Sequence, residues 1–333
     1  MRIRHSFFVI GLPALLLGLH VCGIVVADEQ AVSGGKQRED GGSDWRSTAF
    51  AFSSIRAHLD FIERAHKAQN YPLLEAVCSQ FLQQRDAAMY PYACFELVQA
   101  AAHRRVTKVR RLLEKGADVH VKRADGATAL YMATRRGYGD IVTMLLDYGG
   151  DINEKGHNGA TPLINASETG HEHIVKILLE RGADINAVSD TGGTALLMAC
   201  AKQHVEIAQL LLKRGADVNT KGYIGITPLI IASELGQVDV VSALLERGAA
   251  INAADNGGMT ALHAASSAGQ DEIVALLLCS GADPNTKESQ QGRTPLISSA
   301  QRGHDRVVSL LLDAEAEVNA TDQHGMTALI WAS

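Results

Sequence analysis

The chain has 333 residues, with 31 lysines and arginines against 37 aspartates and glutamates, for a formal net charge of −6. A net negative chain without a basic cluster lacks the electrostatic footprint of a nucleic-acid-binding protein, so we expect no nucleic-acid partner. Aromatic residues make up only 5% of the chain. This composition fits a helical core built from Leu, Ile, Val and Ala.

Residues 1–27 have the pattern of an export signal. Arg2 and Arg4 precede an uncharged stretch, residues 6–27, and small or branched residues stand before Asp28, which suits cleavage by a signal peptidase. The stretch is also near the roughly 20 residues that span a bilayer, so a retained membrane anchor is the alternative. We therefore expect export through the secretory pathway to a periplasmic or extracellular location, with a membrane-anchored scaffold as the second option.

Two further segments precede the main part of the chain. Residues 28–47 contain several glycines among charged residues, which predicts a disordered linker. Residues 48–94 carry apolar stripes at helical spacing, but they are too few for an independent catalytic domain. We expect this helical prefix to cap the C-terminal part of the chain. Its alternative role is a partner-binding extension, for example one that inhibits an enzyme.

Four cysteines remain if residues 1–27 are removed. In an oxidising compartment Cys78 and Cys94 could form a disulfide that pins the prefix. The other interpretation is two small buried hydrophobic residues, because spacing alone does not establish that their Cβ atoms are close. Cys200 and Cys279 are expected to be packing residues.

From residue 126 onward one phrase recurs: Gly, any residue, Thr, Pro or Ala, Leu. Its threonines are evenly spaced, apart from one step that is longer by a single position: Thr128, Thr161, Thr194, Thr227, Thr260, Thr294 and Thr327. A fixed period of about 33 residues predicts a solenoid of stacked units, each too small to bury its own apolar face.

One unit shows the elements that we expect in each. Thr161 followed by Pro162 predicts a helix start, because the hydroxyl can accept from a free amide and proline presets φ at the first helical position. This short helix should end near Gly170, and a second amphipathic helix should end at Gly182. The following residues, 183–192, are rich in turn formers, which indicates a projecting hairpin-like loop.

These units resemble the ankyrin repeat, whose pattern of Gly-x-Thr-Pro-Leu-His, Gly-His, Val-x-x-Leu-Leu and Gly-Ala-Asp-x-Asn they match closely. The resemblance covers residues 95–333: a degenerate first repeat at 95–121, six full repeats and a truncated last one. It implies an all-α solenoid of helix-turn-helix units with β-turn fingers, and a function in binding other proteins. The chain stops about one turn into a first helix, so we expect either a truncated product or an end that another molecule covers.

Some positions depart from the repeat pattern. Arg104, Gln203 and Glu315 stand where glycine is expected, and a residue with a Cβ resists the left-handed conformation that ends a helix. The motif histidine survives only as His263, so hydrogen bonding by that histidine is in doubt for most repeats.

A partner should contact the finger tips and the ends of the first helices, where unusually apolar residues would mark the surface. A central apolar patch with an arginine rim is the candidate binding site, formed by Tyr223, Ile224, Ile226, Leu235 and Met259 with Arg135 and Arg136. The alternative is that neighbouring fingers pack these side chains against one another.

Signals for catalysis and metal binding are weak. His171 and His173 are two positions apart and point to different sides of a helix, unlike the i, i+4 pair of a zinc protease. No phosphate-binding loop or nucleophile elbow occurs. Of two glycosylation sequons, Asn319 is the better candidate because Asn165 lies within a predicted helix. We expect a protein that binds another protein noncovalently, with no catalytic residues, metal or cofactor.

Overall fold

The computed structural model describes residues 91–123 and 126–333, with side chains from Glu96 onward. Contacts within the chain divide it into residues 1–93 and 94–333. The predicted signal segment, the linker and all of the helical prefix up to residue 90 lie outside the described residues. The possible Cys78–Cys94 disulfide also lies outside them, because neither side chain is described.

The described residues form fifteen α-helices and one short 3₁₀ helix, η2, at His157–Gly159, with no strand among them. The predicted all-α repeat solenoid is therefore confirmed. The first helices of the units are α4 Pro91–Ala102, α6 Ala129–Arg136, α8 Pro162–Thr169, α10 Ala195–Ala201, α12 Pro228–Glu234, α14 Ala261–Ala268, α16 Pro295–Gln301 and α18 Ala328–Trp331. The second helices are α5 Val106–Glu114, α7 Gly139–Asp147, α9 Glu172–Glu180, α11 Val205–Lys213, α13 Val238–Glu246, α15 Asp271–Cys279 and α17 Asp305–Asp313.

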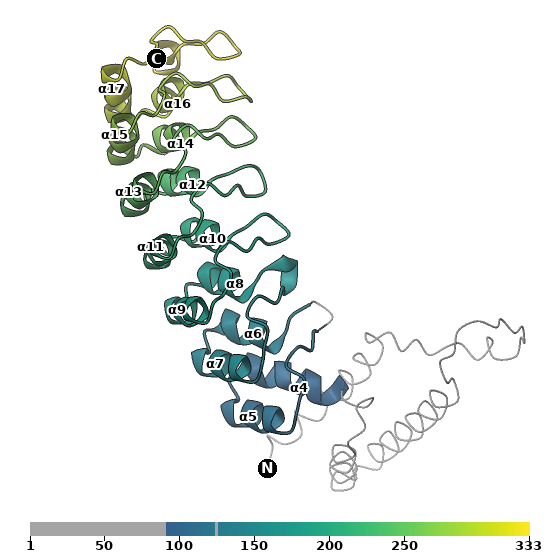
Figure 1. Ribbon diagram of the computed structural model, residues 1–333. Coiled ribbons are helices and arrows are strands. Elements are labelled where there is room, and N and C mark those ends of the chain that lie inside the picture. The colour runs from purple at the N-terminus through teal and green to yellow at the C-terminus, as the bar shows by residue number, and fades with distance from the viewer. Residues whose placement is uncertain (1–90, 124–125) are drawn as a thin grey trace, which may run out of the picture. The chain divides into compact units, whose positions relative to one another are not determined.

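Within residues 94–333 the helices form two layers (Figure 1). The first helices α10 to α16 lie side by side in one layer, and the second helices α11 to α17 form a second layer beside it, to the left in this view. Long loops project from the first-helix layer, away from the second helices. We call these loops fingers one to seven in chain order, finger one being the loop before α6. The tips of fingers two to seven lie near residues 157, 190, 223, 256, 290 and 323.

The repeated threonines begin the first helices, as predicted. In each of the seven units the threonine Oγ1 accepts a hydrogen bond from the backbone N–H three positions on, as Thr161 does from Ile164 at 3.4 Å. This contact satisfies one of the amides that a helix start leaves without a partner. Pro162 stands at the first position of α8, where its missing N–H costs nothing.

The predicted left-handed turns are also present. Gly170 ends α8 with φ of 79°. Arg104, Gln203 and Glu315 adopt φ of 53°, 59° and 61° although each carries a Cβ. The stack imposes this conformation on residues that disfavour it when isolated.

One hydrophobic core runs through all the units. The second helices bury one stripe each, and in α9 Ile174, Val175 and Leu178 are fully buried. The prediction that both remaining cysteines are packing residues is half wrong. Cys200 is buried in α10, but Cys279 is exposed because it ends α15 beyond the buried stripe.

A ladder of asparagines joins the loops of successive units. Asn153 Oδ1 accepts the backbone N–H of Asp184 in the next unit at 2.9 Å. The same contact repeats at Asn186, Asn219, Asn252 and Asn285, with distances of 2.8 to 3.0 Å. Each unit therefore fixes the loop of the unit that follows it, which makes the fingers a regular row.

Candidate protein-binding surface

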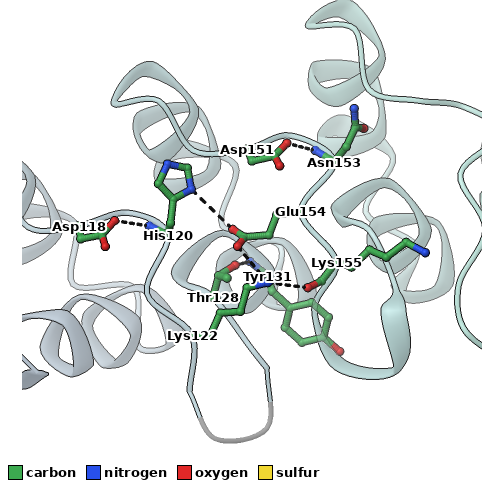
Figure 2. A network of polar contacts seen from close by, with 9 residues as sticks. All are labelled: Asp118, His120, Lys122, Thr128, Tyr131, Asp151, Asn153, Glu154 and Lys155. Carbon is green, nitrogen blue, oxygen red and sulfur yellow. Dashed lines mark hydrogen bonds and ion pairs between the residues drawn. The ribbon is translucent and has the colours of Figure 1, made fainter. Parts of the chain in front are cut away.

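The base of finger one is tied to finger two by a small charged network (Figure 2). Glu154, whose side chain is only 12% exposed, lies 3.3 Å from Lys122 Nζ and 3.9 Å from His120 Nδ1. Lys122 Nζ also donates to the carbonyl oxygen of Lys155 at 3.5 Å. Because these contacts join the two fingers, Lys122 is not a free charge for a partner.

Backbone hydrogen bonds join neighbouring finger tips. Asp190 N donates to Asn158 O, and Asn256 N donates to Ile224 O at 2.8 Å. Similar bonds connect finger five to six and six to seven, through Ser289 and Gln323. Between described fingers three and four no such tip bond forms, so the tip at Tyr223 is held from one side only.

The predicted apolar patch is exposed in part. Tyr223 is 83% exposed, Ile224 49% and Met259 37%. Tyr223 and Ile224 lie on finger four and Met259 on finger five, and the bond from Asn256 to Ile224 holds these two fingers together. The alternative, that neighbouring fingers cover these side chains, is wrong for Tyr223, which is mostly exposed.

The other predicted residues contribute less. Ile226 and Leu235 are half-buried, and Ile226 packs against the core. Arg135 and Arg136 are exposed at the end of α6. They lie away from finger four, because α8 and α10 separate α6 from α12. The role of all these residues in binding stays a prediction.

A hollow of about 610 Å³ opens next to Arg135, between the ends of the first helices and fingers two and three. It was not predicted from the sequence. Its walls come from α6, α8 and α10 and from both fingers, and include Tyr131, Arg135, His157, Ile164, Asn165, Glu168, Thr191, Met198 and Lys202.

Asn165 is the unusual residue of this hollow. Its side chain is 2% exposed, and its Nδ2 donates to the carbonyl oxygen of Tyr131 in the preceding unit at 3.3 Å. The equivalent positions of the other described full units hold Met132, Met198, Ile231, Ala264 and Ser298. Asn165 is thus the only amide side chain among these equivalent positions, most of which are apolar. This difference was the signal in the sequence that could have marked the site.

The charges around the hollow are unevenly paired. Lys202 Nζ lies 3.8 Å from Glu168 Oε1, so these two charges offset each other. Arg135 makes no side-chain hydrogen bond or ion pair within residues 96–123 and 126–333. The rim therefore carries an unpaired positive charge on a chain whose net charge is negative.

Burial shifts the pKa values of two titratable groups in the core. Burial raises the pKa of the Cys200 thiol to about 12. Burial also lowers the pKa of His263, whose Nδ1 and Nε2 contact Thr260 Oγ1 and the carbonyl oxygen of Arg293. In the described ranges no group of three or more His, Cys, Asp or Glu side chains is placed to hold a metal ion.

The family model of ankyrin repeats, a model of three copies, matches this chain at residues 74–156, 97–189, 148–222, 223–288 and 285–333. These matches cover the helix pairs, the caps and the fingers described above. The chain belongs to the ankyrin repeat family. Ankyrin repeats generally mediate protein–protein interaction, so the exposed fingers and the hollow are candidate contact surfaces for another protein. A comparison with the curated proteins gives no significant match.

The part of the chain that the structure describes has no helix long and apolar enough to cross a bilayer. Within the same part, Asn165 is buried and Asn319 is exposed, in keeping with the preference for Asn319 as a glycosylation acceptor.

Proposed function

We propose that this ankyrin repeat protein is exported and recognises another protein noncovalently through fingers four and five. The partner contacts Tyr223, Ile224 and Met259, which form the finger patch. The N-terminal sequence supports export, since Arg2 and Arg4 precede an uncharged stretch that ends before Asp28. N-terminal sequencing of the secreted chain tests this part, and a mature protein that still begins at Met1 would favour the membrane-anchored scaffold.

The exposure of the finger patch is the observation that carries the proposal. A tyrosine that is 83% exposed beside an isoleucine that is 49% exposed places apolar surface in water at the tip of a projecting loop. Apolar patches of this kind mark contact sites, and tyrosine is among the residues that dominate interface energetics. The patch stands on a stack fixed by the asparagine ladder, so little conformational entropy is lost when a partner binds.

The test compares two surface variants of the full chain. Tyr223→Ser combined with Ile224→Ser removes the two most exposed side chains of the finger patch, whereas Val318→Ser removes an apolar side chain that is 54% exposed outside it. Proteins from the secreting cells are captured on the wild-type chain and quantified on each variant. We expect the double variant to lose the proteins that bind the wild type and Val318→Ser to retain them.

Thermal unfolding of both variants provides the structural control. Because the substituted side chains are exposed, we expect midpoints close to that of the wild type. Ile226 is not substituted, since it packs against the core and its loss would confuse binding with folding. Equal capture by the two variants would reject the finger patch as the binding site.

A further inference from the structure

We propose that the hollow between α6, α8 and α10 binds an extended acidic segment of the partner protein. A carboxylate of that segment pairs with Arg135, and one of its backbone N–H groups donates to Asn165 Oδ1. This inference rests on the proposed function and specifies the chemistry of the partner.

The first support is the hydrogen-bonding state of Asn165. Its amide nitrogen is used by the Tyr131 carbonyl, but its Oδ1 has no hydrogen-bond partner among the described residues. A side chain that is 2% exposed and lines the hollow therefore presents an unused acceptor to it. This oxygen is not among the fully buried polar atoms without a partner, so it is open to the hollow, where a backbone N–H of a bound segment can donate to it.

The second support is the charge at the rim. Lys202 and Glu168 are paired with each other, whereas the guanidinium of Arg135 is unpaired among the described side chains. Arginine pairs with carboxylates in a planar, two-bond geometry, so a ligand acid group is the complementary partner.

The third support is the size and position of the hollow. About 610 Å³ lies in the range of pockets that enclose small ligands. A hollow of this volume can hold only a few residues of a bound chain. Its wall at Thr191 adjoins Gly192, and a Cβ on Gly192 would lie 3.2 Å from Tyr223 N. One segment can therefore run from the hollow onto the finger patch.

The probe is an array of immobilised ten-residue peptides with random flanks, whose central residue is fixed as Glu, Gln or Lys. The purified full chain is applied, and bound protein is quantified at low and high salt. We expect the Glu set to bind about two- to fivefold more than the Gln set, as for an ion pair at an exposed arginine. This preference should shrink as salt is raised.

Three variants assign the contacts. Arg135→Glu should abolish the preference for Glu and create one for Lys, whereas Arg214→Glu, at an exposed arginine at the end of α11, should change neither. Asn165→Met, which introduces the residue of the neighbouring units, should weaken binding of the Glu set about threefold to tenfold. Circular dichroism of each variant establishes that it is folded.

The outcomes separate this inference from the proposed function. Three results would reject the proposal of a bound acidic segment. They are a preference for Glu peptides that survives Arg135→Glu, equal binding of the Glu, Gln and Lys peptides, and no peptide binding at all. If partner capture still depends on Tyr223 and Ile224 in that case, the proposed function stands and only the hollow is excluded. If a peptide preference remains while capture ignores the finger patch, the patch alone is rejected.

Discussion

His204 in one unit packs directly on Gly170 in the unit before it. Its Nε2 lies 3.2 Å from the carbonyl oxygen of Glu168, and a Cβ on Gly170 would meet the ring at 2.5 Å. The pairs Gly137 with His171 and Gly269 with His304 show the same arrangement. The glycine is thus needed for two reasons: its φ of 79° and the space that the next imidazole occupies.

Substitution of Gly170 tests both reasons. We expect Gly170→Ala to lower the free energy of unfolding by about 2 to 3 kcal/mol, the sum of a left-handed alanine and a weakened hydrogen bond. Gly303→Ala is the matched control, because Gly303 has φ of 71° with nothing within 4 Å of the added Cβ. It should cost only about 1 to 2 kcal/mol in denaturant unfolding. Equal costs would show that the imidazole contact adds nothing.

A second substitution relieves the contact. Gln203 stands where the other full units have glycine, and the next unit has Gln237 at the histidine position, where its Nε2 donates to Cys200 O at 2.7 Å. In a Gly170→Ala background, His204→Gln should therefore recover part of the lost stability. Additive losses from the two changes would contradict this coupling.

Small polar residues buried in the first helices give the next prediction. Ser233 Oγ in α12 is fully buried without a hydrogen-bond partner, whereas Ser299 Oγ in α16 is equally buried and donates to Leu296 O at 3.0 Å. We expect Ser233→Ala to raise the free energy of unfolding by up to about 1 kcal/mol and Ser299→Ala to lower it by about the same amount. Both gain the helix propensity of alanine, so their difference reports the hydrogen bond. Identical effects on urea unfolding would argue against it.

His263 should make the centre of the stack sensitive to mild acid. Burial lowers its pKa below the usual 6.5, against the opposing effects of the Arg293 carbonyl and the charges of Glu288 and Asp255. The unfolded chain then binds more protons than the folded chain between the two pKa values. Its contribution to stability is complete above about pH 6.5 and is lost as the pH falls toward the folded value.

The measurement is urea unfolding at pH 7.5, 6.5 and 5.5 for the wild type and for His263→Leu, which introduces the residue found at Leu197. We expect the variant to lose less stability than the wild type over this range. Parallel pH profiles would mean that His263 titrates alike in both states.

Asp322 should respond to stronger acid. Burial opposes ionisation of its carboxyl, but hydrogen bonds from Met326 N, Trp331 Nε1 and His324 N together hold its pKa below the ordinary value. A depressed pKa contributes stability that is present above the unfolded value, near about 3.9, and is lost as the pH falls through the folded value. The turn that carries Trp331 should loosen in that window.

Fluorescence of Trp331 detects the change when Trp45, the other tryptophan, is replaced by Phe. We expect the emission to shift to the red as the pH falls below about 4. Asp322→Asn should show the shifted emission already at neutral pH, because one acceptor oxygen is lost. Emission that is unchanged in the variant would exclude the carboxylate as the anchor of Trp331.

The fold was predictable because the sequence of each unit contains the residues that begin and end its helices. Thr161, Pro162 and Gly170 act within a few residues of one another, and the structure has the cap, the first turn and the left-handed end at those positions. Even Gln203 and Glu315 take the glycine conformation, because the repeat register decides it.

The surface was less predictable because it depends on contacts between units. Asn165 meets Tyr131 across 34 positions of the sequence, and only the stacked units enclose the hollow around it. Ile226 looked equivalent to Ile224 in the sequence, but Ile224 is 49% exposed at the finger tip, whereas Ile226 packs against the core. The exposure of Cys279 likewise follows from where the buried stripe of α15 ends.

The asparagine ladder has a consequence for how this array can change in length. Each rung uses one side chain of a unit and one amide of its successor, so removing a whole copy joins an acceptor to an equivalent donor. After deletion or duplication of one complete repeat in this region, every asparagine of the ladder therefore still has a backbone N–H as its hydrogen-bond donor. Copy number can vary by recombination without a compensating substitution, while a shift of a few residues breaks every contact at the junction.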